Sequence, residues 1–178
     1  MASIDSIFEV PMPPRGKGRP RHTVRNGRVL VYTPKETRNW ESQVGIASLV
    51  CRPAMVMEGP VRVDILAVMP RPKRLLRKKD PNGLIWCLTK PDSDNIRKSV
   101  LDALKTWWRD DSQVVDGRTL KVYAERSGHP RVIVRVRSWN ESPDGEAWGL
   151  EMAHQPEDLE GSLAEMVQEL DKDKRSRA

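Results

Sequence analysis

The chain has 178 residues, of which 38% are hydrophobic and 31% charged, so it is long enough to bury the core of one ordinary domain. No run approaches the ~18 to 20 uncharged apolar residues that a bilayer span requires, which excludes a transmembrane protein. Residues 1–138 hold 27 Lys and Arg against 14 Asp and Glu, a net charge of +13, whereas residues 139–178 hold 4 against 11, a net charge of −7. A basic body attracts phosphate backbones, so nucleic acid is the expected partner, and a merely well-solvated surface is the alternative.

Two cysteines and three scattered histidines are too few for a disulfide framework and lack the spacing of a zinc site. The first thirty residues have no apolar core followed by a small-residue cleavage site, because prolines and a basic run interrupt it. We therefore expect a cytoplasmic protein.

The N-terminal part is predicted to form a strand and then a basic arm. Residues 4–10 are typical of a strand that ends at a proline cluster. Residues 13–27 are rich in turn formers and cations, and Asn26-Gly27 is typical of the tight turn of a hairpin. The arm is therefore expected to be a basic hairpin or loop.

The remaining body is predicted from hydrophobic periodicity. The expected elements are a helix capped by Thr33 and running to about Val50, a strand over 61–69, a helix from about Asp94 to Trp108, and strands near 119–125 and 131–138. Together these elements predict an α+β domain over residues 1–138, in the order βαβαββ, with a small mixed sheet backed by helices.

Residues 139–178 are expected to form a separate acidic linker and helix. From Glu157 to about Lys172, apolar residues recur at helical spacing on an otherwise acidic segment; they are Leu159, Leu163, Met166, Val167 and Leu170. Three interpretations stay open: a solvated helical extension, a docking site for a second protein, or an internal DNA mimic that competes for the basic body.

Two pairs of carboxylates bracket the second predicted helix, Asp92 and Asp94 before it and Asp110 and Asp111 after it. Residues i and i+2 share a face of extended chain, so Asp92 and Asp94 can converge, and the return after the helix can bring Asp111 beside them. Carboxylates ~6 Å apart repel by roughly 2 to 3 kcal/mol per pair at an effective dielectric near 20. Such a cluster favours a hard divalent cation, Mg²⁺ or Mn²⁺, as its filler.

The same residues also have a plainer interpretation. Asp94, Lys98 and Asp102 lie at four-residue intervals and suit an ordinary ion-pair ladder on a helix surface. Asp110-Asp111 suits a helix-to-strand turn. A calcium-binding EF-hand loop is excluded, because Arg97 falls where that loop requires glycine.

Two stretches of the sequence resemble a known family. The run Lys-Pro-Asp-Ser-Asp-Asn-Ile-Arg-Lys-Ser-Val-Leu-Asp-Ala-Leu over 90–104, followed by Trp-Arg-Asp-Asp-Ser-Gln-Val-Val over 108–115, closely resembles the signature of RusA-type Holliday junction resolvases. Residues 18–21 and 31–38 resemble the amino-terminal half of the same family. The resemblance covers roughly residues 5–138.

This resemblance implies a homodimeric, Mg²⁺-dependent endonuclease that cuts four-way DNA junctions symmetrically, in a bacterium or a phage-infected host. It implies that Asp92, Asp94 and Asp111 are the catalytic and metal-binding positions, with Lys98 as the essential lysine. Either one or two metal ions suit the hydrolysis of a phosphodiester. Lys98 would stabilise an oxygen of the phosphate or orient the attacking water.

Two basic loops suit a substrate with many phosphates, and neither has an obvious base-reading pattern. The predicted DNA-binding residues are Arg15, Lys17, Arg19 and Arg21 in the first loop and Arg71, Lys73, Arg74, Arg77, Lys78 and Lys79 in the second. Trp86 and Trp108 are candidates for contacts with DNA, whereas Trp40 and Trp107 fall on apolar helix faces.

Two other functions compete with junction resolution. A non-catalytic, basic DNA-binding or architectural protein needs the cations but not the carboxylates. A nuclease that acts on flaps or other branched DNA needs both.

Overall fold

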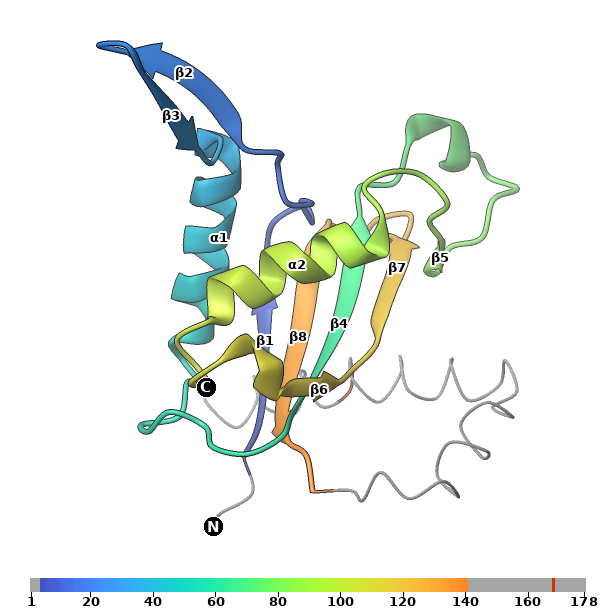
Figure 1. Ribbon diagram of the computed structural model, residues 1–178. Coiled ribbons are helices and arrows are strands. Elements are labelled where there is room, and N and C mark those ends of the chain that lie inside the picture. The colour runs from blue at the N-terminus through green and yellow to red at the C-terminus, as the bar shows by residue number, and fades with distance from the viewer. Residues whose placement is uncertain (1–3, 141–167, 169–178) are drawn as a thin grey trace.

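The computed structural model describes residues 4–140 and Gln168, and residues 4–140 contain two sheets and two α-helices (Figure 1). The strands are β1 (Asp5–Val10), β2 (Arg21–Arg25), β3 (Arg28–Tyr32), β4 (Val61–Met69), β5 (Ile85–Trp86), β6 (Val114–Asp116), β7 (Thr119–Tyr123) and β8 (Arg131–Ser138). The helices are α1 (Lys35–Ser48), α2 (Ser93–Leu104) and the 3₁₀ turns η1 (Lys73–Leu75) and η2 (Asp111–Gln113). Neither α-helix is long and apolar enough to cross a membrane.

The main sheet is mixed, in the order β1-β8-β4-β7-β5, with the short β6 also paired to β4. β4 lies antiparallel to β8 and parallel to β7. Its near-continuous apolar sequence suits this central place, because a central strand is buried on both faces. The predicted α+β domain with a mixed sheet and helices is confirmed.

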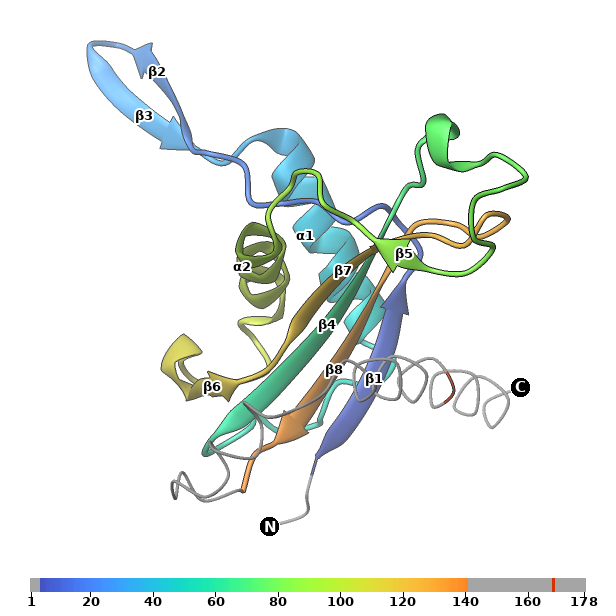
Figure 2. The ribbon, with the colours of Figure 1, turned by 90° about the vertical axis from the view of Figure 1, so that its right-hand side faces the viewer.

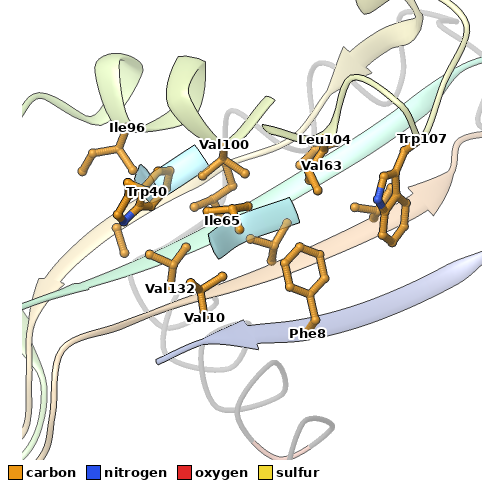
Figure 3. Close-up of a cluster of buried hydrophobic side chains, with 14 of the residues drawn as sticks. Phe8, Val10, Trp40, Val63, Ile65, Ile96, Val100, Leu104, Trp107 and Val132 are labelled. Atoms are coloured by element: carbon orange, nitrogen blue, oxygen red, sulfur yellow. The ribbon is translucent and has the colours of Figure 1, made fainter. Parts of the chain in front are cut away.

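Alternation along β4 points Val63 and Ile65 toward the helices, where they join the main hydrophobic core (Figure 3). Trp40 of α1 and Trp107, which follows α2, are buried in this core, as their apolar spacing predicts. Both helices therefore pack on the same face of the sheet.

The opposite face of the sheet carries a second, smaller cluster of buried apolar side chains. Its members are Leu66, Val68, Val122, Ala124 and Ile133. None of these residues belongs to a helix.

The predicted arm forms a hairpin, because Asn26 and Gly27 adopt positive φ between β2 and β3. The hairpin is a separate two-stranded sheet that projects from the body (Figure 1, Figure 2). Every residue of its two strands is exposed.

Three details differ from the sequence prediction. Thr33 does not cap α1; Pro34 takes the N-cap position, with no side-chain hydrogen bond to the helix. α1 ends at Ser48 rather than Val50. α2 ends at Leu104 rather than Trp108, because the next residues turn to bury both Trp107 and Trp108 in the core.

Candidate active site

The first predicted carboxylates lie together at the start of α2. Asp92 is the N-cap residue, yet its side chain accepts no hydrogen bond from the helix, whereas an N-cap aspartate usually does. Asp94 lies in the first turn, and its Oδ2 is 3.5 Å from Nζ of Lys98, with both side chains 69% exposed. Two exposed carboxylates and a lysine thus share one end of one helix.

Hydrogen bonds from β7 hold the segment that leads into α2. Lys121 Nζ donates to the carbonyl oxygens of Thr89 and Pro91, at 2.7 and 2.8 Å. The hydroxyl groups of Thr89 and Tyr123 are hydrogen-bonded at 2.9 Å. Sequence reasoning missed Lys121, because a lysine on a strand carries no local signal that it will bind a distant loop.

The chain before β2 ties α1 and α2 together. Gly16 approaches α2 so closely that an added Cβ would lie 2.5 Å from Nδ2 of Asn95. Lys17 Nζ forms ion pairs of 2.6 Å with both Glu41 and Asp102. Burial opposes the charge of Lys17, but the hydrogen bonds to these two carboxylates raise its pKa. Lys17, predicted to bind DNA, therefore has its charge engaged inside the protein.

The second carboxylate pair is divided between two tasks. Asp110 caps η2 in a capping box with Gln113, and hydrogen bonds from Ser112 lower the pKa of Asp110. Asp111 is exposed, and Trp108 Nε1 donates to its Oδ1 at 2.9 Å. Both aspartates are exposed, but Asp110 is engaged as the cap of η2, whereas Asp111 accepts a hydrogen bond from the Trp108 indole.

Gln113, which sequence reasoning missed, fixes this turn to the loop before β4. Its Oε1 accepts from the backbone N–H groups of Arg109 and Asp110 at 2.8 and 3.0 Å. Its Nε2 donates to the carbonyl oxygens of Met57 and Gly59 at 3.1 and 2.9 Å. Trp108 is buried beside Met57, so this tryptophan is part of the core and not a surface for DNA.

Asp92 and Asp94 lie at the start of α2, whereas Asp111 begins η2, seven residues after the last residue of α2. β6 follows the Asp111 turn and pairs at Val61, the first residue of β4. Lys121, which holds the start of α2, pairs at Ala67, near the last residue of β4. These two positions on β4 are separated by about 20 Å of strand.

The prediction that the three aspartates converge within one chain is therefore wrong. Among residues 4–140, no three side chains of His, Cys, Asp or Glu lie close enough together to hold a metal ion. The physical reason is the path after α2, which spans about 18 Å with its 12 residues: the returning chain brings Asp116, and not Asp111, beside the first half of the helix, where Arg97 donates to the carbonyl oxygen of Asp116 at 3.3 Å.

A basic cavity of about 820 Å³ lies beside the start of α2. It is lined by residues of the first loop, by Tyr32, by the first turn of α1 and by Pro91. Its cationic side chains are Arg15, Arg19, Arg21 and Lys35. Arg15 pairs with the exposed Glu36 at 2.5 Å.

Two of the cationic side chains in the second basic loop form contacts within the protein. Arg71 donates to the carbonyl oxygens of Leu75, Pro81, Gly83 and Ala124, so it holds the loop in shape. Arg77 pairs with Asp80 at 3.3 Å. The other predicted DNA-binding residues of this loop, Lys73, Arg74, Lys78 and Lys79, are exposed.

The family model for endodeoxyribonuclease RusA matches residues 11–137. This chain belongs to the RusA endodeoxyribonuclease family. It is also similar to the "Uncharacterized protein YqaN" of Bacillus subtilis (strain 168), with 38% identity over 136 residues that cover 73% of this chain and 94% of the relative. The matched region of the RusA model includes both carboxylate pairs and both basic loops, and the family resemblance stated from the sequence is confirmed.

Membership of the RusA family makes the chain a nuclease that acts within DNA strands. In this family member, the residues that come together are Asp92, Asp94 and Lys98, next to the basic cavity. Asp111 does not join them in the described residues, since it begins η2, after the opposite end of α2.

Proposed function

We propose that this RusA-family nuclease resolves four-way DNA junctions by symmetric, Mg²⁺-dependent hydrolysis, and that it acts as a homodimer. The observation that carries the proposal is the pair of exposed carboxylates at the start of α2, beside Lys98 and the basic cavity. A four-way junction has two equivalent strands to cut, and a two-fold dimer supplies two equivalent sites.

We infer that each active site is shared between the two subunits. Two ligands of one Mg²⁺ ion lie within about 4 Å of each other, because each oxygen is ~2.1 Å from the ion. Asp94 and Asp111 of one chain, at opposite ends of α2, do not meet this condition. A two-fold axis across the middle of α2 would set the two helices antiparallel, and each Asp92–Asp94 pair would then face Asp111 of the partner subunit.

The outer surface of α2 suits such a pairing. Asp94, Lys98 and Lys105 follow one another at helical spacing along the exposed side of α2, and the half-buried Leu101, which also packs against the main core, lies between them. In an antiparallel pair, the acidic first turn of one helix would lie near the partner's Lys105, and the two half-buried Leu101 side chains near the axis would meet. The stripe is thus self-complementary, as an isologous interface requires.

The donor set fits a hard divalent cation, since three carboxylates supply the oxygen ligands that Mg²⁺ prefers. Asp92 and Asp94 of one subunit, together with Asp111 of the partner subunit, would hold the cation. When bound, the cation supplies an activated water and neutralises charge on the phosphate. Lys98 would place its ammonium group against a phosphate oxygen, because its only partner in the described chain is the weak, exposed pair with Asp94. Lys121 keeps Asp92 in place by fixing the backbone before it.

The basic cavity would receive the DNA backbone beside this site. Arg19, Arg21 and Lys35 line it, and Pro91, one residue before Asp92, forms part of its wall. We propose that these residues, with Arg15 and with Lys73, Arg74, Lys78 and Lys79 of the second loop, position the arms of the junction through phosphate contacts. Lys17, Arg71 and Arg77 would contribute through the shape of the two loops.

A gel assay with a labelled four-way junction and Mg²⁺ tests this function. The wild type is expected to introduce paired cuts, whereas Asp92→Asn and Asp94→Asn bind the junction without cutting it. Glu58→Gln, which changes an exposed carboxylate that pairs with Arg109, is the matched control and should cut normally. Clear binding by the wild type without any cleavage would favour an architectural DNA-binding protein instead. Preferred cleavage of flaps would favour a different branched substrate.

A further inference from the structure

The β2–β3 hairpin carries cations that have no task within the described chain. It projects from the body, and every residue of both strands is exposed (Figure 1, Figure 2). Residues 21–32 contain three arginines and a histidine but no acidic residue. Within the part of the chain that the structure describes, Arg21, Arg25 and Arg28 form no ion pair. These three guanidinium groups are therefore available to an anion from outside the chain.

The two arginines at the tip face each other. Arg25 is paired with Arg28 across the hairpin, directly before and after the Asn26-Gly27 turn. Like charges at directly opposite positions of antiparallel strands destabilise the pairing. A two-stranded hairpin is only marginally stable by itself, so this repulsion weakens an element that has little stability to lose. An anion bound by both guanidinium groups would remove the repulsion.

The two faces of the hairpin differ in chemistry. Arg21 and Tyr32 are opposite each other in register, and both line the basic cavity beside the start of α2. Alternation puts four further side chains on this face, namely Thr23, Leu30, Arg25 and Arg28. The other face carries His22, Val24, Val29 and Val31. The face that bears the arginines is therefore continuous with the basic cavity.

The base of the hairpin is fixed beside the carboxylates of α2. The backbone N–H of Lys17 donates to the carbonyl oxygen of Asn95, the residue after Asp94, at 3.1 Å. The chain then passes so close to α1 that a Cβ added to Gly18 would lie 2.5 Å from Oγ1 of Thr37. At the other end of the hairpin, β3 is separated from α1 by only two residues. The hairpin thus leaves the body at a defined place next to the candidate active site.

We propose that the arginine-bearing face of the hairpin binds the phosphate backbone of the duplex arm that leaves the active site. This assignment rests on the proposed function, because it takes a branched DNA with duplex arms as the ligand. Four residues of strand separate the Arg21–Tyr32 pair from the Arg25–Arg28 pair, which is about 14 Å. Phosphates of one strand follow each other every ~3.4 Å along the DNA axis, so the tip reaches phosphates about four nucleotides beyond those in the cavity. Arginine suits this contact, because its guanidinium donates two hydrogen bonds to one phosphate.

A DNA backbone fits this face better than a second copy of the chain does. Residues 1–138 carry a net charge of +13, so the body of a partner subunit would repel the arginines at the tip. The valine-bearing face points away from the bound phosphates and serves as an internal control. The acidic linker and helix expected over residues 139–178 lie outside the described residues, except for Trp139, Asn140 and Gln168, and the proposal does not depend on them.

Salt-dependent binding of a labelled four-way junction to the full-length chain tests the proposal, with Mg²⁺ left out so that no strand is cut. The double variant Arg25→Gln and Arg28→Gln should reduce the slope of log K against log salt concentration by about 2, whereas Arg25→Lys with Arg28→Lys should keep it. The matched control Val24→Thr and Val29→Thr should bind as the wild type does. None of these residues belongs to either hydrophobic core, so the fold of the body is retained. An unchanged slope in the glutamine variant, or an equal loss in the control, would overturn the proposal.

Junctions with one uncharged methylphosphonate at a time locate the contact. Replacing the phosphates that the tip binds should weaken the wild type but not the glutamine variant, because that variant has already lost the interaction. Equal weakening of both proteins at every position would refute the contact. So would conversion of the dimer into monomers by the valine control in sedimentation without DNA, because the hairpin would then pack on the partner subunit.

The outcomes separate this inference from the proposed function. A protein that makes paired cuts but keeps its salt slope in the glutamine variant resolves junctions without using the hairpin. A protein that binds branched DNA through the hairpin but does not cut it supports the inference while the proposed function fails.

Discussion

A heterodimer of two inactive variants tests whether the active site spans the dimer. One chain carries Asp94→Asn and the other carries Asp111→Asn, with different affinity tags so that the mixed dimer is purified. If each site combines Asp92 and Asp94 of one chain with Asp111 of the other, the heterodimer has one site with both substitutions and one site with neither. If each site lies within one chain, both sites of the heterodimer are damaged.

The expected magnitudes follow from the separation of these residues. Because Asp94 lies in the first turn of α2 and Asp111 comes seven residues after its last residue, the proposed arrangement assigns the two residues of one chain to different sites, where neither can replace the other. Each homodimeric variant should lose cleavage by about 100-fold or more, equivalent to roughly 3 kcal/mol of transition-state stabilisation. The heterodimer retains half of the wild-type sites and should nick at about half of the wild-type rate.

A supercoiled plasmid with an extruded cruciform gives a direct readout. Paired cuts at the junction produce linear plasmid, whereas a single cut produces an open circle. The wild type should give linear product and the heterodimer open circles. A heterodimer of Asp92→Asn with Asp94→Asn is the matched control and should stay inactive, because both of its sites lack one residue of the pair. A heterodimer of Asp94→Asn and Asp111→Asn that is as inactive as its parents would refute the shared site.

Three further predictions concern DNA contacts, backbone geometry and pH. Arg19→Ala should weaken junction binding and reduce the slope of log K for junction binding against log salt concentration by about 1, as measured by filter binding. Lys17→Ala should lower the stability of the fold, as measured by urea unfolding, with little change in that slope. Gly117→Ala should destabilise the protein by about 3 kcal/mol or more in urea unfolding. Gly117 has a φ of 135°, and a Cβ there would collide with the backbone of Val63. Gly83→Ala, where a Cβ meets no neighbouring atom, should be nearly neutral. Burial opposes the charge of Asp64, but hydrogen bonds led by Arg62 lower its pKa, so its stabilising effect is present above the unfolded value near ~3.9 and is lost as the pH falls below it. Asp64→Asn should cost about 3 kcal/mol at pH 7 and flatten this acid dependence, and an unchanged profile would contradict the role of the pair.

Much of the body could be predicted because its sequence patterns are local. The alternation in residues 61–69 and 131–138 identified β4 and β8, and Asn26-Gly27 identified the hairpin. Helix ends were less predictable. Thr33 is a residue type that often caps helices. The following Pro34, with ψ near 141°, takes the N-cap position instead.

Only the part of the candidate site whose residues are close in sequence could be predicted. The residues that share the start of α2 are neighbours in sequence, so their spacing placed Asp92, Asp94 and Lys98 together, and the family resemblance implied their roles. The position of Asp111 depends on where the chain runs after Leu104. That path is set by the burial of Trp107 and Trp108 and by the two hydrogen bonds of Gln113 to the loop before β4, and no local pattern contains these long-range contacts.

The length of α2 links the two properties that a junction-resolving enzyme needs. In an antiparallel pair, each helix brings its carboxylate pair to one end of the partner and its Asp111 turn to the other. The two complete sites then lie at the two ends of the helix pair, about 18 Å apart. One element would therefore both make each site dependent on the dimer and fix the distance between the two cuts, so that a free subunit has no complete site with which to nick duplex DNA.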